Sequence, residues 1–406
     1  MARKWRIGFL LLFTVQLLYA EPIAVYLTWK GDPTSTMAIQ WIEEGAAKEA
    51  SGVLSYRKLG DPEVHTVFAQ NRLLRKGIAK TPRLYWVEIT RLGADSDYVF
   101  WLEDNAGKVS REYRFHTLPQ DLSRPLRFAV GGDVYFDYAL FCKMNAEVAR
   151  QDPAFVVLGG DIAYAYGHSP FGGSNGDWNR WRTFLQTWTE QMVDTEGRLI
   201  PLLPLAGNHD VRRNKEGMFY DLFLFDEEDT YRLLDIGGYL SLFLLDSGHL
   251  FRIDAQKQWL EEQLGKRRQV PYKIAAFHVP AYPARRDFNK STPTRIRESW
   301  VPLFEKEGVQ AVFEHHNHVY KRTVPIKEGK EDAGGVFYLG DGSWGTPPRK
   351  PLNSSERWFI AKSAAVNAVF IVDLTPSRCT IRALNNKGEF FDETPPISPS
   401  VPIQSP

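Results

Sequence analysis

The spacing of hydrophobic and polar positions changes near residue 120 of this 406-residue chain. Before that point, the sequence carries short runs rich in aromatic and β-branched residues, and several of them alternate apolar with polar positions. These runs lie at residues 25–29, 37–41, 52–57, 84–89 and 98–102, and Gly, Asp, Asn and Pro separate them. About seven short strands in about 100 residues are typical of an immunoglobulin-like β-sandwich. We therefore predict an all-β domain over residues 21–120, which ends in a short linker at Thr117–Pro119.

After Leu126, strand-like apolar runs alternate with segments that repeat apolar residues at helical spacing. Residues 138–150 show this spacing, as a crossover helix should, and residues 178–192 repeat large apolar residues in the same way. A third helix is expected over residues 255–264, with Asp254 as its N-cap. This alternation predicts an α/β domain over residues 121–390. The Pro/Ser-rich end, residues 391–406, is expected to be disordered.

Five polar segments each follow a strand-like apolar run in this second part. They read GGDVYFD (131–137), GGDIAY (159–164), AGNHD (206–210), AAFHVP (275–280) and EHHNHVYKR (314–322). Ligands at the carboxyl ends of several strands converge at one edge of an open α/β sheet. Three Asp or Asn oxygens, one phenol and three imidazoles are too many for one tetrahedral metal and suit two. The pattern therefore predicts a dinuclear metal hydrolase.

The first two segments supply oxygen ligands. Asp133 and Asp161 each follow a Gly pair, and a carboxylate at such a turn is a hard ligand that can bridge two cations. Tyr164 comes three residues after Asp161, and a phenolate ligand needs a strong Lewis acid, so this tyrosine would select Fe(III). Taken alone, Gly-Asp is ordinary turn chemistry and a lone tyrosine is more often a core or rim residue. The five segments together favour the metal site.

The third segment combines an amide with an imidazole. Asn208 adds an oxygen ligand without adding negative charge. Adjacent side chains on irregular backbone usually point apart, so His209 is expected to face the substrate, where it can donate a proton to a leaving oxygen. Asp210 can orient His209 by hydrogen bonding. Arg212 and Arg213 can pair with phosphate oxygens, although solvated loop charges are an equally good interpretation.

The last two segments supply the remaining imidazoles. His278 directly follows a strand, and as a lone histidine it would more often be structural. His316 and His318 alternate around Asn317, so on extended backbone they share one face, which is a stronger signal. Two further histidines follow strand ends and can reach the cleft, but solvent exposure is the simpler expectation for both His168 and His249.

The N-terminus, the net charge and the cysteine content indicate the cellular location and the partners to expect. The basic MARKWR, the apolar run after it and the Leu18-Tyr19-Ala20 site predict a cleaved signal peptide over residues 1–20. No later run is long enough for a membrane span, so we expect a secreted or periplasmic protein without a membrane anchor. A net charge of +1 argues against nucleic acid as a structural partner. Two separately buried thiols are favoured over a disulfide for Cys142 and Cys379.

Taken in order, GD, GDxxY, GNHD, a strand-terminal His and HxH resemble the metallophosphoesterase superfamily. Tyr164 in GDIAY makes the purple acid phosphatases the most similar branch. The β domain, with its TLP exit, also looks like the fibronectin-III-type domain of that branch. The resemblance covers residues 23–384 and implies that the second domain is an αββα sandwich of two mixed sheets.

The resemblance further implies two half-sites that share Asp161 as a bridge. One half-site would bind Fe(III) through Asp133, Tyr164 and His318. The other would bind a divalent Zn, Mn or Fe through Asn208, His278 and His316. The substrate would be a small-molecule phosphate ester, attacked at phosphorus by a metal-bound hydroxide, with His209 facing the leaving group.

One position departs from the family pattern. The last segment usually reads Gly-His-x-His, whereas here His315 takes the glycine position and Glu314 precedes it. A histidine can adopt the left-handed conformation that glycine tolerates, at a cost of about 1–3 kcal/mol. Alternatively, His315 adds a hydrogen-bonding imidazole at the substrate rim. A phosphodiesterase or nucleotidase on the same scaffold stays open as an alternative, as does a non-catalytic extracellular binding protein with a relic site.

Overall fold

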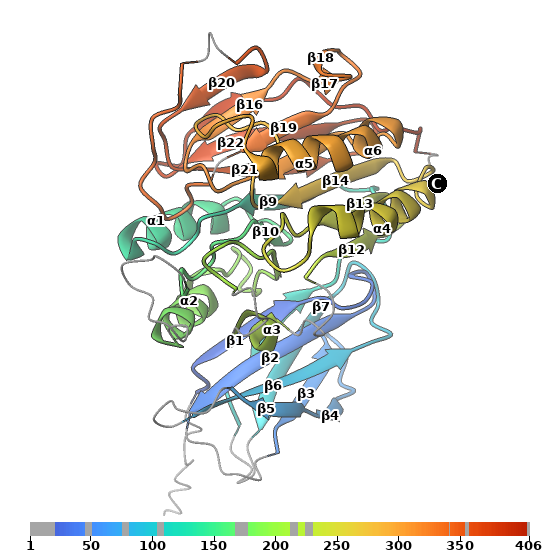
Figure 1. Cartoon of the computed structure of the whole chain (residues 1–406). Helices are drawn as coiled ribbons and strands as arrows, with labels where there is room; N and C mark the ends of the chain where they lie inside the picture. Colours follow the sequence, from blue (N-terminus) through green and yellow to red (C-terminus); the bar gives the residue numbers. More distant parts are fainter. Residues whose placement is uncertain are drawn as a thin grey trace, which may run out of the picture.

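The computed structural model describes residues 21–44, 51–74, 81–103, 109–166, 178–211, 218–223, 230–340, 342–353 and 357–403. These residues form a β-sandwich and a larger α/β part, which lie at the bottom and top of Figure 1. The predicted signal peptide, residues 1–20, lies outside the described residues. Within the described ranges, no helix is long and apolar enough to cross a membrane.

The N-terminal part consists of two four-stranded antiparallel sheets. The first has the order β1 (Ala24–Thr28), β2 (Met37–Glu44), β6 (Pro82–Ile89) and β5 (Gln70–Leu73). The second has the order β4 (His65–Phe68), β3 (Val53–Lys58), β7 (Asp97–Glu103) and β8 (Tyr113–His116). Large buried residues such as Trp41, Leu54, Tyr85 and Phe100 form its core. The predicted β-sandwich is confirmed, and β4 and β5 escaped prediction because each has only four residues, none of which is buried.

The second part contains two mixed sheets. The six-stranded sheet has the order β11 (Leu202–Pro204), β10 (Val156–Leu158), β9 (Leu126–Gly131), β21 (Ala368–Leu374), β22 (Cys379–Asn385) and β23 (Phe390–Glu393). The seven-stranded sheet has the order β12 (Arg232–Ile236), β13 (Leu240–Leu244), β14 (Tyr272–Phe277), β15 (Ala311–Glu314), β19 (Phe337–Gly340), β16 (Tyr320–Thr323) and β20 (Ile360–Ala364). A small hairpin, β17 (Ile326–Lys327) and β18 (Lys330–Glu331), stands apart from both.

The two mixed sheets pack face to face, and helices cover their outer faces (Figure 1). Phe128 and Val157 of one sheet meet Leu242, Ile274 and Phe313 of the other in a shared apolar core. The outer face of the six-stranded sheet packs against α1 (Tyr138–Ala149) and α2 (Trp178–Gln191). The outer face of the seven-stranded sheet packs against α4 (Ile253–Gly265), α5 (Ser291–Ser299) and α6 (Val301–Lys306). The expected αββα sandwich is therefore confirmed.

The β-sandwich is tied to the αββα part through buried hydrogen bonds. Tyr26 Oη and Gln40 Nε2 both donate to the carbonyl oxygen of Leu222, at 2.6 and 2.8 Å, in the short helix α3 (Met218–Phe223). The backbone N–H of Val25 donates to Thr189 Oγ1 at 3.0 Å, and that hydroxyl lies on α2. Because these groups are buried, the contact orients the two parts relative to each other.

Two expectations about local structure are wrong. Asp254 does not cap α4, which begins at Ile253; its carboxylate instead accepts a hydrogen bond from Ser299 Oγ at 2.9 Å and so joins α4 to α5. The expected disordered tail is ordered as far as residue 403, and only residues 404–406 lie outside the described part. Ile397 exchanges backbone hydrogen bonds with Cys379 at the start of β22, so the tail has a partner despite its prolines. Cys379 and Cys142 are both free thiols.

Candidate metal centre

The five predicted segments lie at the carboxyl ends of neighbouring strands. In the six-stranded sheet, β9, β10 and β11 are parallel neighbours, and they lead into Asp133, Asp161 and Asn208. In the seven-stranded sheet, β14 and β15 are parallel neighbours that lead into His278 and the HHNH segment. Because the sheets face each other, the two sets of strand ends meet at one edge.

A carboxylate, a phenol and an imidazole converge on one side of the site. Tyr164 Oη donates to Asp133 Oδ1 at 2.9 Å, and His318 Nε2 lies 2.8 Å from the same oxygen. The Tyr164 hydroxyl is also 3.3 Å from His318 Nε2. All three side chains are buried. The residues predicted for the Fe(III) half-site therefore lie together.

A second trio lies beside the first. Ligand atoms of Asp161, His278 and His316 all lie within 4.8 Å of one another. His278 Nε2 is 3.2 Å from Asp161 Oδ2 and 3.2 Å from His316 Nδ1. The other nitrogen of His278, Nδ1, lies 2.9 Å from the carbonyl oxygen of Gly159, which orients the ring so that Nε2 faces the trio.

Asn208 supplies an observation that fits a bound cation. Its amide oxygen Oδ1 is buried, and within the described part of the chain no donor lies within hydrogen-bonding distance of it. Buried polar atoms in native proteins nearly always have a partner, so an orphaned acceptor next to carboxylates and imidazoles fits a metal ligand. Mixed oxygen and nitrogen donors of this kind suit iron, zinc and manganese.

Backbone strain concentrates on the same residues. Five of the predicted ligands have a left-handed backbone although none is glycine, with φ of 55° at Asp133, 51° at Asp161, 52° at Tyr164, 67° at His316 and 53° at His318. Each such residue costs roughly 1–3 kcal/mol, which the surrounding structure must offset. Asp133 contributes to that support, because its Oδ2 accepts a hydrogen bond from the His316 backbone N–H at 2.8 Å. Strain of this kind collects at functional sites.

The charges of the site favour protonated forms of His278 and Tyr164, so a bound cation would compete with protons for these two side chains. Burial is the largest single influence and lowers the pKa of His278, but the charges of Asp161 and Asp133 and the hydrogen bonds to Asp161 and Gly159 together raise it to about 9. Burial, together with the carboxylates of Asp133 and Asp161, raises the pKa of Tyr164 well above its usual value. Tyr164 therefore ionises only where a cation compensates the two carboxylates.

His209 lies next to the two trios, held by contacts other than the expected one. Its Nδ1 lies 2.8 Å from the carbonyl oxygen of Tyr166, and its ring stacks on Tyr164 with centroids 4.9 Å apart. Asp210 does not orient it, so that expectation is wrong. The buried Asp210 carboxylate instead accepts from the backbone N–H groups of Ile162 at 2.8 Å and residue 207 at 2.9 Å. It thereby joins the turns that carry Asp161 and Asn208.

His315 occupies a place that neither expectation described. Its side chain is 2% exposed, so it is not a rim imidazole. The left-handed conformations fall instead on the two residues of the HxH motif. A Cβ built on Gly159 would lie 1.9 Å from His315 Nε2, and one built on Gly132 would lie 2.6 Å from its Cγ. The imidazole thus fills the space that two glycines of the opposite sheet leave open.

One further histidine reaches the site. His249 is partly buried, with its ring centroid 5.5 Å from that of His278, so the expectation of solvent exposure is wrong. Asp246 shapes its loop, because its carboxylate accepts four backbone N–H groups from residues 248–251. The sequence signal that could have placed His249 at the site is the run LDSGH (245–249), which directly follows β13. That strand pairs in parallel with β14, the strand before His278. His168, Arg212 and Arg213 lie outside the described residues.

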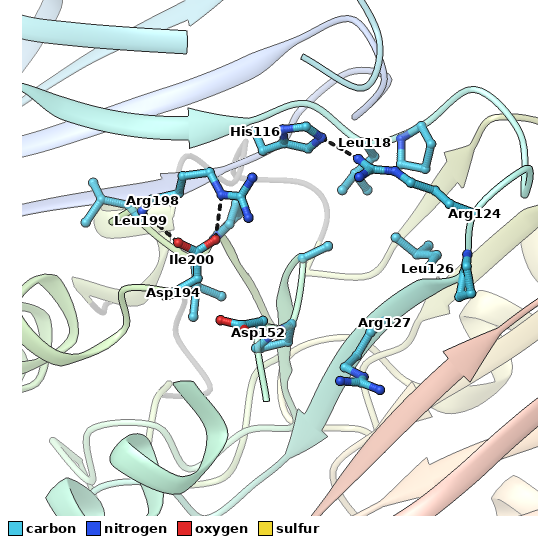
Figure 2. Close-up of a pocket in the computed structure, with 15 residues that line it drawn as sticks. His116, Leu118, Arg124, Leu126, Arg127, Asp152, Asp194, Arg198, Leu199 and Ile200 are labelled. Carbon is cyan, nitrogen blue, oxygen red and sulfur yellow. Dashed lines mark hydrogen bonds and ion pairs between the residues drawn. The ribbon is translucent and has the colours of Figure 1, made fainter. Parts of the chain in front are cut away.

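A separate cavity of about 150 Å³ lies at the junction of the β-sandwich and the αββα part. Figure 2 shows Arg198 donating to Asp194, at 2.6 Å between Nε and Oδ2, and His116 beside Arg124, at 2.7 Å. The cavity adjoins the starts of β9, β10 and β11, whereas the metal-type residues follow their ends. Arg198 pairs there with Asp194, and Arg127 pairs with Asp373 in the six-stranded sheet, so these charges already have protein partners.

Comparison with known proteins agrees with this geometry. Residues 126–320 match the family described as calcineurin-like phosphoesterase, and residues 22–117 match the purple acid phosphatase N-terminal domain. The chain therefore carries a calcineurin-like metallophosphoesterase domain preceded by a purple acid phosphatase N-terminal domain. The resemblance drawn from the five segments is therefore confirmed.

Metallophosphoesterases similar to this one include purple acid phosphatases 15 and 18 of Arabidopsis thaliana. Both are 24% identical, over 64% and 70% of this chain, and the matches cover 53% and 64% of those relatives. The chain thus spans between half and two thirds of their length. The structure of purple acid phosphatase PPD1 from yellow lupin (Lupinus luteus) seeds has the same fold, with a TM-score of 0.75 at 15% identity. That match covers 92% of this chain and 74% of the lupin chain.

Proposed function

We propose that this metallophosphoesterase hydrolyses esters of phosphoric acid at a site that holds two cations. The observation that carries the proposal is the meeting of two ligand trios, Asp133–Tyr164–His318 and Asp161–His278–His316, at the facing edges of the two sheets. The orphaned amide oxygen of Asn208 adds a seventh donor. Seven donors suit two metal ions.

The two trios have different chemistry. Asp133, Tyr164 and His318 would hold Fe(III), because the raised pKa of the phenol requires a strong Lewis acid. Asn208, His278 and His316 would hold a divalent Zn, Mn or Fe, and Asp161 would bridge the two ions. Such ions supply Lewis-acid chemistry: they polarise phosphate oxygens and lower the pKa of water.

His209 is the proposed proton donor to the leaving oxygen. The contact between its Nδ1 and the Tyr166 carbonyl orients the ring, so Nε2 lies at the opposite edge and is available to the substrate. Stacking on Tyr164 places the ring beside the first trio. We expect a small-molecule phosphate ester as substrate and a secreted or periplasmic protein without a membrane anchor after signal cleavage.

Metal content and hydrolysis of p-nitrophenyl phosphate by the purified protein test the proposal. We expect two metal ions per chain and turnover that falls at least about 100-fold in Asp161→Asn. Asp61→Asn, an exposed carboxylate of the β-sandwich, serves as the matched control and should keep full turnover. A wild-type protein that binds no metal, or an Asp161→Asn variant with full turnover, would contradict the proposal.

Two measurements separate the neighbouring possibilities. Comparing rates on a phosphate monoester and on a bis-ester distinguishes a monoesterase from a phosphodiesterase on the same scaffold. A purple colour that bleaches on reduction would report the bond between the Tyr164 phenolate and Fe(III). A colourless but active protein would support the proposed hydrolase activity and contradict the assignment of Fe(III) to Tyr164. A non-catalytic relic would bind metal without turning over either ester.

A further inference from the structure

The loop after the predicted ligand His278, residues 279–290, is held in an unusual way. Three cationic side chains from elsewhere in the domain, Arg297, Lys321 and Arg357, donate hydrogen bonds to its backbone carbonyls. Arg297 binds the carbonyls of residues 281 and 288 at 2.6 and 2.7 Å. Lys321 binds that of residue 282 at 2.6 Å, and Arg357 binds those of residues 283 and 286 at 2.7 and 3.0 Å. Five carbonyls of one loop are thus satisfied by charged donors.

A buried ion pair between Glu314 and Lys321 also holds this loop. Glu314 Oε1 accepts from the backbone N–H of Ala281 at 2.7 Å, while Glu314 Oε2 pairs with Lys321. Both members of this ion pair are buried, at 0% and 2% exposure. A buried charge pair is retained at a desolvation cost, and hydrogen bonds to the loop offset that cost here. The loop is therefore rigid and preorganised.

A second segment, residues 346–352, is joined to this loop by hydrogen bonds. Leu352 N donates to the carbonyl of Ala284 at 3.0 Å, and Arg285 Nη1 donates to that of Lys350 at 2.5 Å. Arg349 N donates to the carbonyl of His318 at 2.7 Å, which connects the segment to a predicted metal ligand. The two joined segments carry five cationic side chains and one carboxylate: Arg285, Arg286, Lys290, Arg349 and Lys350, and Asp287.

Arg286 stands out among these five cationic side chains. It is partly buried, and within the described residues no acceptor lies within hydrogen-bonding distance of its Nε. Its loop is joined through residues 349–352 to the His318 carbonyl, and its charge acts on Asp133, Asp161 and His316. Burial, and then the charge of Arg349, lower the pKa of Arg286. Among the described residues, the Nε donor of this guanidinium therefore has no protein acceptor.

Bound cations would leave Arg286 without a favourable charge partner in the site. They would neutralise the two carboxylates that attract Arg286 and leave it beside like charges. A reacting phosphate that binds to two cations is already well compensated, so it does not require the Arg286 guanidinium as well. The unpaired donor of Arg286 fits an additional anionic group on the same substrate.

We infer that Arg286 is a specificity-determining residue that binds a second anionic group of the substrate. The substrate class is a phosphate ester whose leaving group carries a further phosphate. This inference rests on the proposed function, since it concerns the substrate of the same site. Arg286 acts in substrate binding and leaves the proton to His209.

The test compares two substrates that differ only by the second phosphate: 1,3-propanediol monophosphate and 1,3-propanediol bisphosphate. Arg286→Gln should lower kcat/KM for the bisphosphate by about 10-fold or more, mainly through KM, since a hydrogen bond to a charged group is lost. Its effect on the monophosphate should stay within about threefold. Arg286→Lys should recover part of the loss because the charge is kept and the planar fork is not.

Arg285→Gln is the matched control. It removes the adjacent positive charge, whose side chain is already bonded to the Lys350 carbonyl, and should change neither substrate by more than about threefold. The affinity of methylenebisphosphonate relative to orthophosphate provides a readout without turnover. It should fall about 10-fold or more in Arg286→Gln and stay constant in Arg285→Gln.

The outcomes separate the inference from the proposed function. Equal losses on both substrates in Arg286→Gln would overturn the inference, because Arg286 would then bind the reacting phosphate. Unchanged values on both would overturn it as well. If the metal-loaded wild type hydrolyses neither ester, the proposed function fails. The bisphosphonate affinities then still decide whether Arg286 binds a second anionic group.

Discussion

Gly159→Ala places a methyl group in the space that the His315 imidazole occupies. The added Cβ would lie 1.9 Å from Nε2 and 2.0 Å from Cδ2 of His315, about 1.5 Å inside the 3.4 Å at which ordinary contact begins. The backbone at Gly159 lies outside the left-handed region, so alanine itself adds no conformational strain there. His315 is buried and cannot yield without displacing the HxH segment.

The expected loss is large for one methyl group. Overpacking of an interior typically costs about 1–3 kcal/mol, and an overlap of this size places Gly159→Ala at the upper end. For a domain of this length, a loss of about 3 kcal/mol lowers the unfolding temperature by roughly 6–12 °C. Turnover should fall as well, because the Gly159 carbonyl orients His278 through its Nδ1 at 2.9 Å.

Calorimetric unfolding of four proteins measures the effect: the wild type, Gly159→Ala, His315→Ala and the double variant. His315→Ala alone leaves a cavity and also destabilises. In the double variant the new methyl group finds room, so the two changes should be non-additive by about 1–3 kcal/mol. Gly265→Ala in α4 is the control, because its Cβ would meet only Arg268 Nη2 at 4.0 Å, and it should be as stable as the wild type or up to about 1 kcal/mol more stable. Additive losses, or a Gly159→Ala protein that unfolds with the wild type, would refute this packing.

Two further predictions concern buried charges. Lys321→Met leaves Glu314 buried without its partner and releases the Tyr282 carbonyl, so urea unfolding should show a loss of about 3–5 kcal/mol that Glu314→Gln partly restores; a loss unchanged by Glu314→Gln would contradict the pairing. Burial alone would raise the pKa of Asp392, but hydrogen bonds from Arg322 and Tyr320 lower it below the usual value. Its stabilisation is present above the unfolded pKa of about 3.9 and is lost as pH falls through the lower folded pKa. Asp392→Asn should therefore be less stable than the wild type at pH 7 in urea titrations, with a difference that shrinks below pH 4; a constant difference would contradict this.

The placement of the candidate ligands at strand ends could be predicted from the sequence because the signals of the strands are local. Buried parallel strands are continuous apolar runs, so LRFAV and YKIAAF indicate where β9 and β14 end. The residue after such an end lies at the sheet edge wherever the strands are parallel. The grouping of Asp133 with Tyr164 and His318 came from the family resemblance, and the distances agree with it.

The features that escaped prediction depend on partners far along the chain. The position of His315 depends on two glycines of the opposite sheet, and nothing near His315 in the sequence reports them. Asp210 could not be assigned because its donors include the backbone N–H of Ile162, on another strand end. The tail is ordered because Ile397 pairs with Cys379, and backbone pairing of this kind is not visible in a Pro/Ser-rich composition. His249 reaches the site only because β13 and β14 are neighbours.

We propose that Asp161 lies between two cations. A crystal structure of the purified protein, with anomalous scattering measured at the iron and zinc edges, would locate them. Two metal peaks are expected, and both should contact Asp161. One peak should also contact Asp133, Tyr164 and His318, and the other Asn208, His278 and His316. A single peak, or a pair in which Asp161 contacts only one metal, would rule out a bridging Asp161.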